Sequence, residues 1–204
     1  FAAQFVKDKK VLDIACGSGY GSKFLKESGA KTVDGVDISK EIIDFAKTNY
    51  CTDGVNFAVA NAETFSPDKR YNVIISFETI ECVDDFKAAL KNLYNLLEPR
   101  GILLISSPNR IIFSPKLKSI LERPANPFHA REFTIQELLQ ELEQCGLMLC
   151  GDCLFGQRQR THFNNRYFRR LHKAIFNPDV KANPAVEKIK KTPRYFVIKA
   201  LKPQ

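Results

Sequence analysis

The feature that most constrains the fold is a short apolar strand that runs directly into a glycine-rich turn. Residues 11–21 have the sequence VLDIACGSGYG. Glycine has no Cβ atom and adopts positive φ freely, so a turn of this composition lets the backbone approach a ligand closely. The pattern predicts a buried parallel strand that delivers Asp13 and the turn to one edge of a sheet.

Strand and helix signals alternate along the chain, which is typical of a parallel sheet covered by helices on both faces. Helices are expected after the glycine turn, after Ser39, after Asp84 or Asp85, and behind Thr134, which has capping-box spacing to Glu137. The expected strands are residues 10–15, 31–37, 55–60, 71–77, 101–107, 147–155 and 195–201. The chain is therefore predicted to have an α/β fold.

Positive charge is concentrated in one segment. The formal net charge of the 204 residues is +8, and residues 157–194 contain eleven Lys and Arg against two acidic residues. A chain of this length fits one domain. We predict a single domain over residues 1–204, with residues 156–193 as a basic insertion or substrate cover before the last strand. Such a segment is either a solvated surface or a contact for an anionic substrate, nucleic acid or lipid headgroup.

The six cysteines are scattered through apolar segments, and the pair Cys150 and Cys153 has no second Cys or His pair at matching spacing. We expect buried free thiols and no metal site. No apolar run approaches the roughly 20 residues that a spanning helix needs. The first residues lack a signal-peptide pattern, so a cytoplasmic location is expected. Because the chain begins at Phe1 rather than Met, an N-terminal piece is expected to be missing.

The spacing of the glycines argues against a dinucleotide. A dinucleotide-binding turn has the pattern Gly-x-Gly-x-x-Gly, but the third glycine here, Gly21, comes one place early and Ser22 takes the position where glycine is required. Asp13 would also repel a pyrophosphate. A sulfonium cofactor with an amino-acid ammonium group instead favours negative charge nearby.

With these motifs, residues 9–155 resemble the class I S-adenosylmethionine-dependent methyltransferases. The resemblance implies a Rossmann-like, doubly wound, seven-stranded sheet, mostly parallel with an antiparallel last strand, in three αβα layers. It also implies S-adenosyl-L-methionine as cofactor and S-adenosyl-L-homocysteine as product. The cofactor-binding residues that it implies are Asp13, Cys16, Gly17, Gly19, Asp37, Ile38, Asn61, Ala62 and Phe77.

In this resemblance the glycine turn holds the methionine moiety, and Asp37 accepts hydrogen bonds from both ribose hydroxyls. Ile38 packs on the adenine, and Asn61 replaces the Asp that the family usually has at the adenine edge. Each residue also has a structural explanation, since Asp37 can complement a helix dipole, Ile38 can belong to the core and Asn61 can form a turn. Suitable residues occur at the ends of three successive strands. This favours ligand binding over the separate structural explanations, because ligands bind at the carboxyl ends of strands in open α/β sheets.

Two candidate catalytic residues follow, Glu78 and His129. Many small-molecule members of the family have Glu-His after the fourth strand, whereas this chain has Glu81-Cys82. His129 lies in NPFHAREFT, which resembles a segment of methyltransferases thought to act on sugars or other cell-surface metabolites. It is either a general base, because its ordinary pKa is near neutrality, or a residue that hydrogen-bonds its loop in place. Glu78 either contacts cofactor or substrate, or caps a helix.

The substrate is expected to be a polar or anionic small molecule or a glycan precursor, methylated on oxygen. Arg166, Arg169 and Arg170 would share a helical face and bind an anionic acceptor such as a phosphorylated or nucleotide-linked sugar. One alternative is an RNA methyltransferase that uses the basic, aromatic-bearing insertion. A second alternative is a non-catalytic S-adenosylmethionine-binding module. The sequence predicts no oligomeric state.

Overall fold

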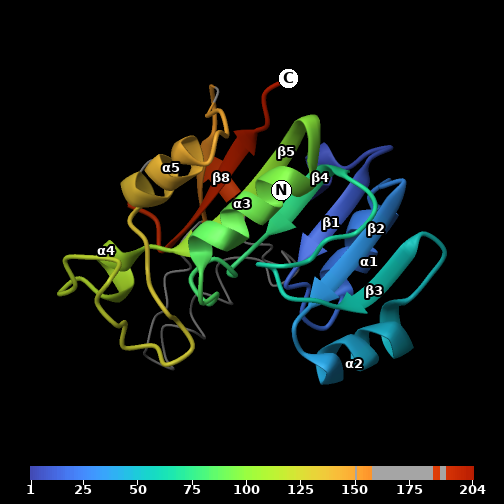
Figure 1. Ribbon diagram of the computed structural model, residues 1–204, viewed down its shortest axis with the longest axis horizontal. Coiled ribbons are helices and arrows are strands. Elements are labelled where there is room, and N and C mark those ends of the chain that lie inside the picture. Colours follow the sequence, from blue (N-terminus) through green and yellow to red (C-terminus); the bar gives the residue numbers. More distant parts are fainter. Residues whose placement is uncertain (150, 158–185, 189–191) are drawn as a thin grey trace, which may run out of the picture.

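The structure is a computed structural model and describes residues 1–149, 151–157, 186–188 and 192–204. One sheet runs through it in the strand order β3-β2-β1-β4-β5-β8-β6-β7 (Figure 1). The ladders from β3 to β5 are parallel, and β8 is antiparallel to both β5 and β6. The strands are β1 (Lys10–Ile14), β2 (Thr32–Asp37), β3 (Val55–Val59), β4 (Tyr71–Ser76), β5 (Leu97–Pro108), β6 (Leu154–Gln157), β7 (Val186–Lys188) and β8 (Tyr195–Leu201).

Helices cover both faces of this sheet, which confirms the expected three layers. On one face lie the 3-10 helix η1 (Ala2–Phe5), α1 (Tyr20–Glu27) and α2 (Lys40–Tyr50), and Leu25 of α1 is buried in the same cluster as Val73. On the other face, at the front of Figure 1, lie α3 (Phe86–Leu96) and α5 (Ile135–Gln144). Leu90 of α3 and Leu138 of α5 are buried in the same core as Leu12.

The starts of these helices follow from local capping chemistry. The Ser39 hydroxyl accepts a hydrogen bond from Ile42 N, and the Asp85 carboxylate accepts from two backbone N–H groups at 3.0 Å. Thr134 and Glu137 form the complete capping box that their spacing predicts. Each cap satisfies N–H groups that have no partner within the helix. Of the helices in the described ranges, none is long and apolar enough to cross a membrane.

The structure differs from the sequence prediction around the sixth strand. That strand was expected at residues 147–155, but β6 spans Leu154–Gln157, and Met148 makes only an isolated bridge to Leu201. Gly151 adopts φ +57°, which interrupts the extended backbone between the two pairings. The sheet also gains a short edge strand, β7, within the predicted insertion. The connection from β5 to α5, expected to be irregular, contains the short helix α4 (Arg110–Phe113).

Parallel pairing brings the acidic residues of interest to one edge. In the β1–β2 register Asp13 lies beside Gly35, and in the β1–β4 register it lies beside Ile75. The carboxyl ends of β1, β2 and β4 consequently meet at the lower side of Figure 1, where the glycine turn, Asp37 and Glu78 follow. This edge is where open α/β sheets bind ligands.

Candidate active site

The glycine turn and the end of β2 are joined through the carboxylate of Asp37. Gly17 N donates a hydrogen bond to Asp37 Oδ2 at 3.0 Å, and Ser39 N donates to Asp37 Oδ1 at 3.0 Å. Each carboxylate oxygen retains lone-pair capacity after these bonds. The neighbouring Ile38 is 70% exposed, so it is not a core residue. This exposure removes one structural explanation for Ile38 and leaves an apolar surface beside an oriented carboxylate.

Gly17 and Gly19 of the turn are glycines for different structural reasons. Both adopt positive φ, +54° at Gly17 and +87° at Gly19. A Cβ on Gly19 would lie 2.7 Å from Phe57 and 2.8 Å from Ala46, so close packing within the protein requires that glycine. A Cβ on Gly17 would meet no atom within 4 Å. Open space above a positive-φ glycine beside Asp37 is a cradle that a ligand can enter.

The end of β3 lies next to the end of β2, because Ala60 N donates to Asp37 O at 2.9 Å. The Asn61 side-chain oxygen accepts from Glu63 N at 2.7 Å, and Ala62 O accepts from the Asn92 amide at 3.0 Å. The turn-forming explanation for Asn61 is therefore real. One further lone pair on its oxygen, and its amide N–H groups, are still available to a ligand.

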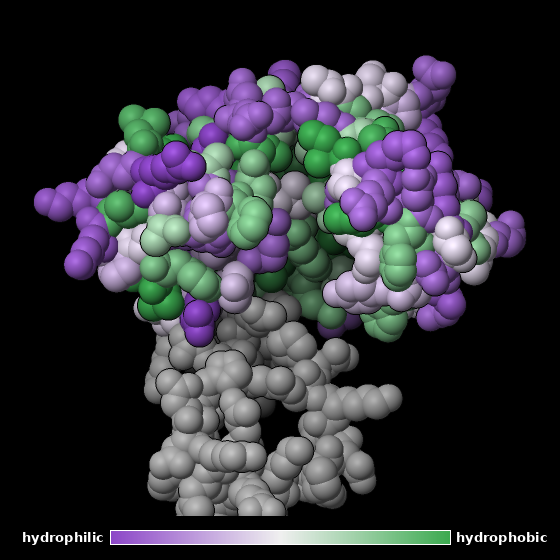
Figure 2. Space-filling model, turned by 90° about the horizontal axis from the view of Figure 1, so that it is seen from below, coloured by the Kyte–Doolittle hydropathy of each residue, from purple (hydrophilic) through white to green (hydrophobic). Residues whose placement is uncertain are grey.

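A cavity of about 570 Å³ opens on the α1 face of the sheet at this same edge. Figure 2 views this side from below and shows hydrophobic residues inside a hollow with more polar rims. The volume lies within the range of small-molecule sites. Its lining is mainly apolar and aromatic with three polar side chains, and comprises Phe1, Ala2, Ala3, Asp13, Tyr20, Gly21, Phe24, Leu25, Ile75, Phe77, Glu78, Ser106, Tyr195 and Val197.

Asp13 lies at the inner end of this cavity. Its carboxylate is buried, and Oδ2 accepts a hydrogen bond from the Ser22 hydroxyl at 2.6 Å. Desolvation raises the pKa of Asp13 to about 6, against the lowering effect of Ser22, and the charge of Asp37 raises it further. A cationic group in the cavity would favour the ionised form of Asp13. The site therefore has a built-in preference for positive charge near the glycine turn.

Glu78, two residues after the end of β4, is held in a strained conformation at the cavity wall. Its φ is +53°, a region that residues with a side chain rarely adopt. The Ser106 hydroxyl accepts from Glu78 N at 3.0 Å and donates to Glu78 Oε1 at 2.6 Å. Desolvation raises the pKa of Glu78 to about 7, although the residue as a whole is exposed at the open cavity. Strain and a raised pKa in one cavity residue are typical of functional groups.

His129 is held by both ring nitrogens. Nδ1 lies 3.0 Å from Glu132 Oε1 and Nε2 lies 2.8 Å from the Asn126 amide nitrogen. Since an amide nitrogen only donates, Nε2 accepts and Nδ1 carries the proton that is donated to Glu132. In this arrangement Nε2 has no free lone pair for a substrate proton. The geometry supports the loop-positioning role rather than the general-base role for His129.

Of the residues predicted from sequence, the structure brings Asp13, Phe77 and Glu78 together in the cavity. Cys16, Gly17, Gly19, Asp37, Ile38, Asn61 and Ala62 lie around the adjoining strand ends. Arg166, Arg169 and Arg170 lie outside the described residues, as does Cys150. Sequence reasoning missed Ser22, Ser106 and Tyr195. A serine at the end of the buried fifth strand was a usable signal for Ser106.

Comparison with known proteins agrees with this geometry. A family model described as a methyltransferase domain matches residues 1–150. A probable S-adenosylmethionine-dependent methyltransferase of Mycolicibacterium smegmatis is 34% identical over 139 residues, 68% of this chain and 51% of the relative. A ubiquinone biosynthesis O-methyltransferase of Coxiella burnetii is 36% identical over 108 residues, 52% of this chain and 46% of the relative. The chain thus spans about half the length of the curated relatives it matches.

Among solved structures, a Thermotoga maritima protein described as a methyltransferase and possible histamine N-methyltransferase superposes with a TM-score of 0.70. It is 20% identical, and the match covers 98% of this chain and 86% of that one, which shows the shared fold. The chain belongs to the S-adenosylmethionine-dependent methyltransferase family, whose cofactor is S-adenosylmethionine. The open cradle at Gly17, the exposed Ile38 and the buried acid Asp13 fit that cofactor.

Proposed function

We propose that this chain carries an active site that methylates a hydroxyl oxygen of a small polar molecule. The observation that carries the proposal is Glu78, a strained carboxylate on the cavity wall whose pKa is raised to about 7 by desolvation. A base with a pKa near the working pH is most effective at accepting a proton as a bond forms. The Coxiella burnetii relative is named an O-methyltransferase, which is consistent with a hydroxyl acceptor.

The residues at the strand ends would hold the cofactor. The Asp37 carboxylate would bind the ribose hydroxyls, Ile38 would cover the adenine, and Asn61 with Ala62 would bind the adenine edge. The backbone of Cys16, Gly17 and Gly19 would surround the methionine moiety, with Asp13 opposite its positive charges. S-adenosylmethionine supplies a methyl group on a sulfonium, which is already a good leaving group.

The chain's own residues then supply position and a proton acceptor. Phe77, half-buried and lining the cavity, orients the acceptor beside the end of β4. Glu78 takes the hydroxyl proton on its carboxylate, with Ser106 fixing Oε1 at 2.6 Å. Alignment of the reacting groups contributes strongly to the acceleration in such a displacement. His129 supports this site from outside, by holding its loop.

An anionic or glycan-type acceptor is the finer part of the proposal. It is supported by the eleven Lys and Arg in residues 157–194, which include Arg166, Arg169 and Arg170. The described cavity itself has an acidic and aromatic lining, without Lys or Arg among its lining residues. The insertion is therefore our candidate source of cationic contacts to the acceptor. Reversing the charge of these three arginines should raise the Michaelis constant for an anionic acceptor and leave that for a neutral one unchanged.

The test of the base is Glu78→Gln, measured by S-adenosylhomocysteine release against a panel of phenols, sugar nucleotides and sugar phosphates. Loss of the proton acceptor should lower kcat by about 10²–10⁴-fold, while calorimetry with S-adenosylhomocysteine shows unchanged affinity. Glu27→Gln on the surface of α1 is the matched control. Unchanged kcat in Glu78→Gln would refute the role of Glu78. Absence of turnover by the parent chain on every acceptor would favour the non-catalytic alternative.

A further inference from the structure

Two loops meet near Glu78, and their contact brings together an unusual set of side chains. The loop after β4 contributes Glu81 and Cys82, and the segment before α5 contributes His129 and Glu132. The backbone joins the two loops, because Ala130 N donates to Glu81 O at 2.8 Å and the next residue also donates to that oxygen. The juxtaposition is therefore a fixed part of the fold.

Three potential metal ligands converge at this junction. A carboxylate oxygen of Glu81, the sulfur of Cys82 and a ring nitrogen of His129 all lie within 4.8 Å of one another. Glu81 is buried and His129 is half-buried, whereas Cys82 is exposed, contrary to the buried thiols expected from the sequence. The set thus has a buried floor and an open side from which an ion can enter.

The buried part of this cluster has oxygen atoms without partners. Glu81 Oε2 and Glu132 Oε2 are buried and make no hydrogen bond within the described structure. An unpaired buried carboxylate oxygen is costly, and such atoms are usually satisfied by a cation or a donor. Glu81 is 1% exposed, so bulk water does not provide the missing hydrogen bond. The cluster is therefore incomplete as its protein atoms stand.

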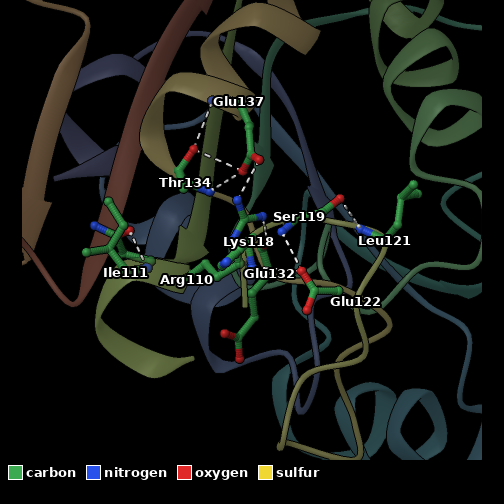
Figure 3. Close-up of polar contacts among 10 residues, drawn as sticks. Arg110, Ile111, Lys118, Ser119, Leu121, Glu122, Glu132, Thr134 and Glu137 are labelled. Atoms are coloured by element: carbon green, nitrogen blue, oxygen red, sulfur yellow. Dashed lines mark hydrogen bonds and ion pairs between the residues drawn. The ribbon is translucent and has the colours of Figure 1, made fainter. Parts of the chain in front are cut away.

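The arginines closest in the chain do not complete it. The Arg110 guanidinium binds the backbone carbonyl of Glu132 at 2.9 Å and the carboxylate of Glu137 at 2.6 Å. Figure 3 shows the Glu132 carboxylate pointing away from this guanidinium. Arg131 donates to the backbone carbonyls of Val83 and Asp84. Both cations are thus engaged elsewhere, and Glu81 forms no ion pair in the part of the chain that the structure describes.

We propose that Glu81, Cys82 and His129 bind a divalent metal ion of the zinc type, which ties the two loops together. Mixed carboxylate, thiolate and imidazole ligands are typical of zinc and its neighbours rather than of magnesium or calcium. The hydrogen bond from His129 Nδ1 to Glu132 is the carboxylate support that usually stands behind a metal-bound histidine. Metal bound through Nε2 displaces the Asn126 amide, and the Cys82 proton passes to solvent.

The proposed ion has a structural role and takes no part in methyl transfer, although Glu81 lies close enough to Glu78 for their charges to interact. It neutralises the buried carboxylate of Glu81 and joins the loop after β4 to the segment that leads into α5. The predicted effect is thus on stability and on spectroscopic properties, which can be measured without any acceptor. The sequence predicted no metal site, because Glu81-Cys82 and His129 are far apart in the chain and have no familiar ligand spacing.

The experiment uses cobalt(II) as the probe on metal-free protein in a non-thiol reductant. One equivalent should bind and produce the ultraviolet charge-transfer band of a cobalt–thiolate bond. A free cobalt(II) concentration of about 100 times the dissociation constant should raise the melting temperature of the protein by roughly 5–10 °C. Cys82→Ser should abolish the band, and Glu81→Gln should weaken cobalt binding at least about tenfold.

The matched control is Cys153→Ser, because Cys150 and Cys153 could also bind cobalt. Retention of the band in Cys153→Ser and its loss in Cys82→Ser supports the proposal. Retention of the band in Cys82→Ser, or no cobalt binding by the parent protein, overturns it. Cys82 is exposed, so its replacement by serine should leave the fold intact, and circular dichroism of the apo-variant verifies that. Failure of this site would leave the result of the Glu78 test unaffected.

Discussion

Replacing each of two glycines in the turn by alanine separates a ligand-binding role from a packing role. Gly17→Ala and Gly19→Ala both place a Cβ on a residue with positive φ. The left-handed conformation costs alanine about 1–2 kcal/mol. Restriction of the unfolded chain offsets about 0.4–1 kcal/mol of that cost. For Gly17→Ala, where no atom lies within 4 Å of the new Cβ, the net loss of stability is about 1 kcal/mol.

Gly19→Ala should lose more stability, because its Cβ would overlap Phe57 at 2.7 Å. Overpacking adds about 1–3 kcal/mol, which brings the total to roughly 2–4 kcal/mol. Denaturant unfolding followed by circular dichroism measures both values. The order of the two variants follows directly from the surroundings of the two Cβ positions.

For cofactor affinity we expect the larger effect from the other variant, Gly17→Ala. The new methyl of Gly17→Ala occupies the space proposed for the ligand, and an overlap of about 1–3 kcal/mol lowers affinity roughly tenfold to 100-fold. The assay is calorimetric titration with S-adenosylhomocysteine. Gly29→Ala is the control, since Gly29 has φ +100° and a nearest neighbour at 3.6 Å, far from the turn. If Gly17→Ala binds S-adenosylhomocysteine as tightly as Gly29→Ala, the cradle is assigned wrongly.

Three further predictions concern charged groups. Arg110→Ala should reduce the free energy of unfolding by about 2–3 kcal/mol in a denaturant titration, because it removes charge-assisted hydrogen bonds from a buried guanidinium; Lys116→Ala, in the same connection, should change it little. The pKa of Asp13 is raised to about 6, so the folded state binds the proton more tightly and stability should fall as pH rises from about 4 to 6; a pH series that shows the same fall in Asp13→Asn would contradict this. Asp37→Ala should abolish measurable S-adenosylmethionine affinity, and retained affinity in calorimetry would refute the ribose contact.

Much of the fold follows from local sequence, because short-range physics decides it. The apolar strand at Lys10–Ile14 and the capping box at Thr134 act within a few residues. The late start of β6 was not predictable from hydropathy. Residues 147–149 and 154–155 are both apolar, and Gly151, with its positive φ, lies between their two pairings. The same apolar pattern is compatible with one strand or with a bridge and a strand.

The candidate site also contains some residues that the sequence could identify and others that it could not. Asp13, Asp37 and Asn61 could be found because each directly follows or lies in a strand, and parallel strands end at one edge. Ser106 and Tyr195 meet Glu78 through pairing between β4, β5 and β8, which depends on the register of segments far apart in the chain. The ring orientation of His129 depends on Asn126 and Glu132 together. Motif spacing therefore identified the residues around the cofactor better than it identified the residues around the acceptor.

The pairing of β6 with β7 also has a consequence for how this scaffold can be altered. Gln157 lies opposite Val186 in an antiparallel register, so the two described residues that flank the interval 158–185 are neighbours in the sheet. The entropic cost of closing a loop between two adjacent ends depends only weakly on loop length, since each doubling of that length adds only about 0.6 kcal/mol. The interval is consequently a natural exchange point. Replacing it with a tight hairpin turn, or with the corresponding segment of a relative, should leave the sheet and the cofactor edge intact, and would test whether this interval governs acceptor choice.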